Sequence, residues 1–201
     1  GDPILYKRVQ IPEALTREGF IKGQTVQYGG DIRMGDLKGD GRPDFVVYRS
    51  VHDAHDGGGM KPVFMGAFTI EGELLWQRGQ GGEQPSRPGP VLVYDINQDG
   101  RAEVVCFWKK PGMDAPEDSL ADVVLQIRDG RTGEVLRENA PPELTQRSGH
   151  GANWVHQRLL AADLRGLGRP RDFVVKLGTT VVAFDENLET LWTHGNPYDR
   201  H

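Results

Sequence analysis

A motif that occurs three times constrains the fold of this chain more than any other feature. In each copy an Asp is followed by a polar turn with Gly and then by a short run of β-branched and aromatic residues. The copies start at Asp36, Asp95 and Asp163 and read DLKGDGRPDFVVYR, DINQDGRAEVVCFW and DLRGLGRPRDFVVKL. Runs of this composition, bounded by turn residues, are typical of β-strands. The chain is therefore expected to repeat one strand-containing unit.

Each motif is followed by a segment that reads as two strands joined by a two-residue turn. The segments are KPVFMGAFTIEGELLWQ, DVVLQIRDGRTGEVLRE and TTVVAFDENLETLWTH, with Glu-Gly, Thr-Gly and Glu-Asn at the turns. Each unit therefore predicts a four-stranded antiparallel sheet. Several strands are apolar throughout, whereas the strands of a sheet with one solvent-exposed face would alternate apolar and polar residues. We accordingly expect both faces of each sheet to be covered.

Four-stranded sheets that stack face to face around an axis form a β-propeller. We expect an all-β protein with about three blades, at residues 30–80, 90–140 and 154–195, and a strand at 3–12 that belongs to an adjacent blade. Propellers usually close with about 4 to 8 blades, and an incomplete ring leaves sheet faces and edges bare. The ring would be completed by the remaining blades of a longer chain or by another copy.

Charge and composition exclude some classes of partner. The net charge is −5 and the isoelectric point is about 5.7, which leaves no basic field for nucleic acid. No apolar run approaches the roughly 20 residues that cross a bilayer, so no membrane partner is expected. The one cysteine, Cys106, lies in an apolar run and is expected to be buried without a disulfide partner. Trp76, Trp108 and Trp192 end strands and are expected to pack between sheets.

The second copy of the motif has the spacing of a calcium loop. Calcium prefers six to eight oxygen ligands from alternate residues of a tight loop, with Gly at its sharp bend. The candidate ligands are the side chains of Asp95, Asn97, Asp99 and Glu103 and the carbonyl of Arg101. Lys38 and Leu167 stand at ligand positions in the other two copies. The loop is therefore either a site for structural Ca²⁺ or a turn that its Asp residues cap.

The long polar loops are expected at the opposite edge of the sheets from these turns. Function concentrates in loops that a rigid scaffold gathers on one face. Candidate catalytic residues are His55, His150, His156, Arg49 and Arg158, and candidate substrate-binding residues are His52, Lys61, Asn153 and Trp154. One His alone in such a loop is more commonly a solvated residue. Their gathering at one face favours a site.

Three stretches resemble a known group of proteins. GGGMKPVFMGAFTIEGELLWQ, VLVYDINQDGRAEVVCFW and above all the stretch from GHGANWVHQR to the last residue are similar to seven-bladed carbohydrate-active propellers. This group includes the rhamnose-glucuronate lyases and a related α-L-rhamnosidase family. The resemblance implies that the chain is the N-terminal part of a seven-bladed ring, secreted or periplasmic. It also implies an acidic, rhamnose-capped plant polysaccharide as substrate, and it is compatible with calcium in the scaffold.

Elimination from a uronate requires a cation on the carboxylate, a base for the neighbouring proton and an acid for the leaving oxygen. The two candidate arginines suit the carboxylate, and the three candidate histidines suit the base and the acid. Asn153 would hydrogen-bond the sugar and Trp154 would stack on it. Hydrolysis needs two carboxylates about 5 to 10 Å apart, and these loops offer no obvious pair. We therefore expect a β-eliminating lyase, with a rhamnosidase-type hydrolase or a noncatalytic propeller that binds a glycan or a protein as alternatives.

Overall fold

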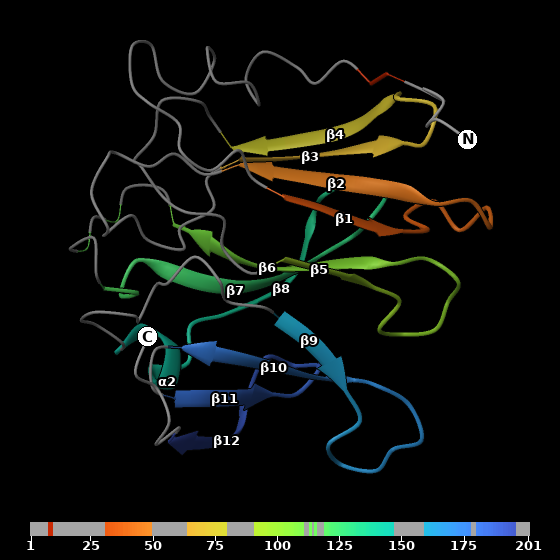
Figure 1. The fold of residues 1–201 in the computed structure, drawn as a ribbon. Coiled ribbons are helices and arrows are strands. Elements are labelled where there is room, and N and C mark those ends of the chain that lie inside the picture. Colours follow the sequence, from red (N-terminus) through yellow and green to blue (C-terminus); the bar gives the residue numbers. More distant parts are fainter. Residues whose placement is uncertain are drawn as a thin grey trace, which may run out of the picture.

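Three four-stranded antiparallel sheets make up the fold (Figure 1). The computed structural model describes residues 8–9, 31–49, 64–79, 91–110, 113, 115, 119–146, 159–177 and 180–195. In every sheet the strands lie in chain order, each hydrogen-bonded to the next. The expectation of an all-β protein built from such sheets is confirmed.

The strands of the three sheets follow the three sequence units. Sheet 1 contains β1 (Asp31–Gly35), β2 (Asp44–Arg49), β3 (Phe64–Thr69) and β4 (Leu74–Gly79). Sheet 2 contains β5 (Val91–Tyr94), β6 (Glu103–Lys109), β7 (Val123–Arg128) and β8 (Val135–Asn139). Sheet 3 contains β9 (Leu159–Ala162), β10 (Asp172–Leu177), β11 (Thr180–Phe184) and β12 (Thr190–Gly195). A short helix, α2 (Pro142–Thr145), lies between β8 and β9.

The strand expected at residues 3–12 lies largely outside the described residues. Within it, only Arg8 and Val9 are described, and neither belongs to a strand. No described helix has the length and apolar character that a bilayer span requires.

Two apolar clusters hold the three sheets in a stack. The first joins sheets 1 and 2 and contains Tyr48, Met65, Trp76, Val104 and Trp108 among others. The second joins sheets 2 and 3 and includes the Leu144 side chain of α2. Every residue of β7 is buried because this strand has a sheet on each side. Full burial of one large apolar side chain stabilises the fold by roughly 1.5–3 kcal/mol, so the two clusters supply much of the driving force.

The prediction of two-residue turns between the third and fourth strands is wrong. The connections are residues 70–73, 129–134 and 185–189, and each third strand carries a bulge next to its turn. Side-chain oxygens cap these wider turns. Asp129 accepts from the Thr132 N–H at 2.7 Å, and Asp185 accepts from the Glu189 N–H at 3.0 Å. The side chain of the first turn residue therefore stabilises a turn that is longer than the two residues predicted from the Gly positions.

Hydrogen bonds between sheets run from the fourth strand of one sheet to the third turn of the next. The Trp76 indole donates to the Gly130 carbonyl at 2.7 Å, and Arg78 donates to the carbonyl of Thr132 at 2.6 Å. One sheet further on, Arg137 donates to the Glu186 carbonyl and Asn139 to the Leu188 carbonyl. We call this repeated contact the inter-sheet latch. It fixes the position of each sheet on the next more specifically than apolar packing can.

Sheet 2 also buries a charge next to its cysteine. The Arg128 guanidinium donates to the Gly133 carbonyl at 2.8 Å and to Gln126 at 2.6 Å, and it lies 4.8 Å from the centre of the Trp108 ring. Cys106 is fully buried, as expected, and it is a free thiol. Burial raises the pKa of the Cys106 thiol to about 11, and Arg128 opposes this shift only in part.

We expect Cys106 to resist alkylation in the native protein. At about pH 8 a thiol with so high a pKa is almost wholly protonated, and reagents act on the exposed thiolate. Mass spectrometry after iodoacetamide treatment should therefore find no adduct in the folded chain and one adduct in denaturant. Equal labelling of folded and denatured chains would show that the sheet 1–sheet 2 interface opens readily.

Candidate functional site

The three copies of the Asp-Gly motif form three similar loops. Loop 1 spans Asp36–Asp44, loop 2 spans Asp95–Glu103 and loop 3 spans Asp163–Asp172, and in Figure 1 all three lie at the right-hand edge. Each loop joins the first strand of its sheet to the second. The β1–β2, β5–β6 and β9–β10 connections are therefore equivalent, as the repeat indicated.

The first carboxylate of each loop caps the backbone of the bend. Asp36 accepts from the Gly41 N–H at 2.7 Å, Asp95 from the Gly100 N–H at 3.0 Å and Asp163 from the Gly168 N–H at 2.9 Å. These three glycines have positive φ angles of 78°, 89° and 81°. The shared element of the motif is thus a carboxylate cap over a left-handed Gly.

The last carboxylate of each loop caps the start of the same loop. Asp44 accepts from the Leu37 N–H at 3.1 Å, Glu103 from the Ile96 N–H at 2.8 Å and Asp172 from the Leu164 N–H at 2.9 Å. All three carboxylates are buried. Each buried negative charge therefore needs a favourable partner beyond the backbone.

In loops 1 and 3 a basic side chain of the same loop is the partner of the buried carboxylate. The Lys38 Nζ lies 2.7 Å from an Asp40 oxygen and 3.9 Å from an Asp44 oxygen. The hydrogen bond from Lys38 holds the pKa of Asp40 below its usual value. In loop 3 the Arg165 guanidinium lies 2.7 Å from an Asp172 oxygen. The second residue after the first Asp thus supplies the positive charge in both loops.

Loop 2 has a neutral amide at this position. Asn97 Nδ2 donates to Glu103 at 3.1 Å and to Asp99 at 3.3 Å, while Arg101 pairs with Asp99 at 3.0 Å. Burial raises the pKa of Glu103, and the nearby Asp99 and Asp95 charges add to this effect. Loop 2 therefore concentrates negative charge around a position where its sister loops place a cation.

The oxygen atoms of loop 2 are of the types that bind calcium, but they do not surround a common position where an ion could sit. Carboxylate, amide and carbonyl oxygens form the hard ligand set that Ca²⁺ prefers. Among the described residues no group of three or more His, Cys, Asp or Glu has an arrangement that could hold a metal. In particular, Asn97 presents its nitrogen to Asp99 and Glu103. An ion would require the amide of Asn97 to turn its oxygen inward.

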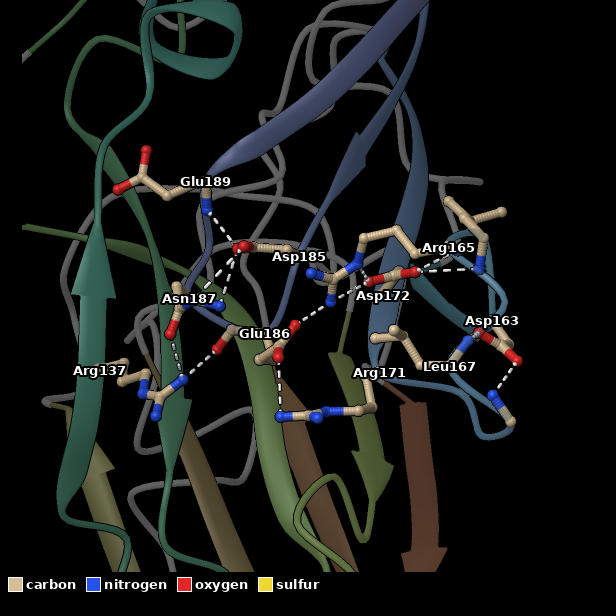
Figure 2. Close-up of polar contacts among 12 residues, drawn as sticks. Arg137, Asp163, Arg165, Leu167, Arg171, Asp172, Asp185, Glu186, Asn187 and Glu189 are labelled. Atoms are coloured by element: carbon tan, nitrogen blue, oxygen red, sulfur yellow. Dashed lines mark hydrogen bonds and ion pairs between the residues drawn. The ribbon is translucent and has the colours of Figure 1, made fainter.

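A hollow lies beside loop 2, between sheets 2 and 3. Its lining residues include Asn97, Glu103, Arg137, Arg169, Arg171 and Glu186. Glu186 is the hub of the polar contacts in Figure 2: its carboxylate pairs with Arg165 and with Arg171, and its carbonyl accepts from Arg137. Arg169 donates to the Asn97 carbonyl at 3.1 Å and thereby joins loop 3 to loop 2. Arg137 and Arg169 join the two sheets, and the described lining residues of the hollow include no histidine that could serve as the base or acid of an elimination.

The candidate catalytic and substrate-binding residues lie outside the described side chains. Arg49 ends β2 and pairs with Phe64 of β3 through its backbone, but its side chain is not described. The residues beyond the described parts are His52, His55, Lys61, His150, Asn153, Trp154, His156 and Arg158. The described strand ends next to them, at Arg49, Phe64 and Leu159, lie at the opposite ends of their strands from the three loops. The predicted roles of these residues therefore stay predictions.

The sequence reading missed the residues that join the sheets. Arg137 and Glu186 were not singled out, and their contact links sheets 2 and 3 over 49 positions of the chain. Arg171, which pairs with Glu186 within sheet 3, was not singled out either. The alignment of the three units could have drawn attention to Arg165, which occupies the position of Lys38. No periodic pattern marks Glu186 as the partner of three arginines.

One family model matches the chain over residues 6–150. Its description is rhamnogalacturonan lyase family 11, C-terminal domain. The match covers sheets 1 and 2 and ends before sheet 3. It describes a C-terminal domain, whereas the resemblance in sequence implied the N-terminal part of a ring. No curated protein matches the chain in sequence.

Solved structures of lyases share the fold. An exotype rhamnogalacturonan lyase YesX has a TM-score of 0.58 at 20% identity, over 86% of this chain and 34% of its own. A rhamnogalacturonan lyase PL11 from Bacillus licheniformis has a TM-score of 0.56 at 21% identity, over 85% and 35%. Rhamnogalacturonan lyase YesW has a TM-score of 0.59 at 19% identity, over 85% and 35%. The chain thus spans about a third of the length of these lyases.

Substitution of Gln98 in loop 2 should stabilise the fold. Gln98 has a φ angle of 62°, and the equivalent residues Gly39 and Gly166 have 74° and 68°. A left-handed conformation costs a residue with a Cβ about 1–2 kcal/mol, part of which is offset by the greater freedom of Gly in the unfolded chain. Gln98→Gly should therefore raise the free energy of unfolding by about 0.5–1 kcal/mol in urea titrations. Gln98→Ala keeps the Cβ and should show no such gain, and a gain of the same size in both variants would contradict the explanation.

Proposed function

The chain belongs to the rhamnogalacturonan lyase family 11, and from this premise we propose that it forms part of the scaffold of a polysaccharide lyase. The match over residues 6–150 is the observation that carries this proposal. The substrate would be an acidic polysaccharide that contains rhamnose and a uronate, cleaved by β-elimination. The activity is proposed for the complete protein, because the chain spans about a third of the length of the lyases that it resembles.

We propose further that the three sheets are blades of a β-propeller. The strand β5 lies beside both β1 and β9, so the first strands of successive sheets are neighbours, as expected for strands around an axis. The blades would then span residues 30–80, 90–140 and 154–195, in one domain that continues beyond three sheets. Further blades of the parent protein would complete the ring, with seven blades as the number implied by the sequence resemblance.

The chemistry would take place at the edge opposite the three Asp-Gly loops. In our proposal Arg158 or Arg49 binds the uronate carboxylate, and His150, His156 or His55 serves as base or acid. The cation makes the neighbouring proton removable, since it neutralises the carboxylate as negative charge develops. The site would lie outside the cell or in the periplasm, where a polysaccharide of this kind is accessible.

Activity assays on the complete protein can separate elimination from its rivals. A lyase should generate the ultraviolet absorbance of an unsaturated uronate from rhamnogalacturonan or from a rhamnose-capped glucuronate polymer. Release of reducing ends without this absorbance would indicate a hydrolase, and binding without cleavage would indicate a noncatalytic propeller.

Single substitutions test the assignment of the residues. We expect at least one of His55→Ala, His150→Ala and His156→Ala to lower kcat by about 10²-fold or more, the size typical of lost general acid–base catalysis. The control is Arg131→Ala, an exposed residue in the 129–134 turn, which should leave kcat unchanged. Full activity in all three His variants would reject the histidine mechanism.

Loop 2 is our proposed site for a structural calcium ion. Its ligands would be the side chains of Asp95, Asn97, Asp99 and Glu103 with the carbonyl of Arg101. The support is the neutral Asn97 at a position where Lys38 and Arg165 supply positive charge in the sister loops. A bound ion would supply the missing charge and stiffen the loop.

Calcium binding should depend on the charge at position 97. Calcium at 100-fold its Kd should stabilise the chain by about 2.7 kcal/mol, visible as a higher Tm. Asn97→Lys copies loop 1 and should abolish the calcium response while the protein without calcium stays at least as stable as the wild type. Asn97→Asp is the matched control and should keep the response. An equal calcium response in the Lys variant would place the ion elsewhere.

A further inference from the structure

The hollow between sheets 2 and 3 contains more guanidinium groups than the described carboxylates pair with. Its described lining includes three arginines and two glutamates, so the lining has a net positive charge. The whole chain, in contrast, has a net charge of −5. The hollow is therefore a local excess of positive charge on an acidic protein, and such a site attracts anions.

Two of these arginines have no carboxylate partner among the described residues. Arg137, from β8, donates from one terminal nitrogen to the Glu186 carbonyl and, at 2.8 Å, to Asn187 Oδ1. Arg169, from loop 3, donates from one terminal nitrogen to the Asn97 carbonyl at 3.1 Å. A guanidinium has five N–H donors in one plane. The described contacts thus leave the Nε and the second terminal nitrogen of both arginines for a further acceptor.

The third arginine of the hollow has a buried donor without an acceptor. Arg171 pairs with Glu186 through a terminal nitrogen at 2.7 Å, and in Figure 2 Glu186 lies between Arg171 and Arg137. The Nε of Arg171 is buried and has no hydrogen-bond partner in the described part of the chain. Buried polar groups in proteins are nearly always hydrogen-bonded, so an unpaired one indicates that an acceptor binds nearby.

The two glutamates do not cancel the charge of the arginines. The carboxylate of Glu186 is already shared between Arg165 and Arg171. The carboxylate of Glu103 accepts from the Ile96 N–H at 2.8 Å and from the Asn97 amide at 3.1 Å. Neither acid contacts the guanidinium of Arg137 or Arg169, so these two cations remain available to a ligand.

One wall of the hollow is apolar. Leu136 lines it and is 53% exposed, and the buried side chains of Ile96 and Ile127 also contribute. An apolar wall does not favour a bare inorganic anion, whereas a sugar acid has a C–H face beside its carboxylate. The volume is about 280 Å³, near the lower limit of roughly 300 Å³ for ligand pockets. The hollow therefore suits one small organic acid.

We propose that this hollow binds one uronic acid residue of a polysaccharide. Arg137 and Arg169 would bind its carboxylate, Arg171 would supply a further donor, and Leu136 would contact the C–H face of the sugar. The hollow lies beside loop 2, so this site is separate from the proposed catalytic edge and would hold the polymer without cleaving it. The choice of a uronate as the natural ligand rests on the proposed function, whereas the chemistry of carboxylate binding does not.

Calorimetric titrations of the 201-residue chain test the proposal. The ligands are sodium galacturonate, galactose as the neutral control and sodium sulfate as the inorganic anion, at one ionic strength and with EDTA present. Galacturonate should bind about 10-fold or more tightly than either control, because only galacturonate combines a carboxylate with an apolar face.

Substitutions locate the bound carboxylate. Arg137→Gln and Arg169→Gln should each weaken galacturonate binding by about 10-fold or more, the effect of losing one charge-assisted hydrogen bond. Leu136→Ala should weaken the binding of galacturonate and leave that of sulfate unchanged. The control is Arg131→Gln in the 129–134 turn, outside the described lining of the hollow, which should leave the affinity for galacturonate unchanged.

Several results would overturn the proposal. Equal binding of galactose would show that the carboxylate is not recognised, and equal binding of sulfate would identify a site for inorganic anions. Binding that requires calcium in place of EDTA would assign the carboxylate to an ion and not to the arginines. Full affinity in Arg137→Gln and Arg169→Gln, with loss in Arg158→Gln, would place the ligand at the proposed catalytic edge. If Arg137→Gln fails to fold, Arg169→Gln and Leu136→Ala decide the outcome.

This test is independent of the lyase assay. Absence of galacturonate binding would reject the accessory site and leave the proposed elimination chemistry untouched. Conversely, a complete protein without lyase activity would reject the proposed function, while binding that Arg137→Gln and Arg169→Gln weaken would still establish the carboxylate site.

Discussion

The apolar character of both faces of each sheet is the constraint on which the rest of the structure depends. A four-stranded sheet with side chains such as Phe107 and Trp108 on opposite faces cannot leave either face in water without a large loss of free energy. Sheet 2 meets the requirement because it lies between two other sheets. Apolar packing alone would allow neighbouring sheets to slide. The latch from Trp76 and Arg137 to the next turn removes this freedom. Burial of apolar side chains therefore drives the stacking of the sheets, and these hydrogen bonds fix the position of each sheet on the next.

Charge at the loop edge distinguishes three units that otherwise share one backbone design. All three loops bury a carboxylate at the start of the second strand, and the same backbone caps serve each of them. Lys38 and Arg165 neutralise this charge from within the chain, whereas Asn97 cannot. The units have thus kept the turn and varied the source of positive charge. Under the proposed function, the middle unit is the one that would depend on an ion from the surroundings.

The sheets could be predicted from the sequence because their signals are local. Runs such as EVVCFW, the Asp-Gly turns and the repeat itself predict strands, pairing and the burial of Cys106, and the structure confirms them. The third turns were predicted too short, because a bulge and capping by Asp129 or Asp185 depend on geometry that residue type alone does not reveal. The partners of Glu186 are two arginines of loop 3 in its own sheet and Arg137 of sheet 2, and their spacing in the sequence follows no period. Trp76 and Trp108 pack between sheets as expected, whereas Trp192 is 40% exposed because no described sheet lies against its face of sheet 3.

The order in which the three loops touch gives the middle one a mechanical role. Ala102 of loop 2 donates its N–H to the Asp36 carbonyl at 2.8 Å, and the carbonyl of Asn97 accepts from Arg169. Loop 2 is therefore the centre link of a short chain of contacts along this rim. A change in the conformation of loop 2 would therefore disturb hydrogen bonds to both outer loops at once. If the proposed calcium site is occupied, gain or loss of its ion would act on this edge of all three sheets and not on one loop alone.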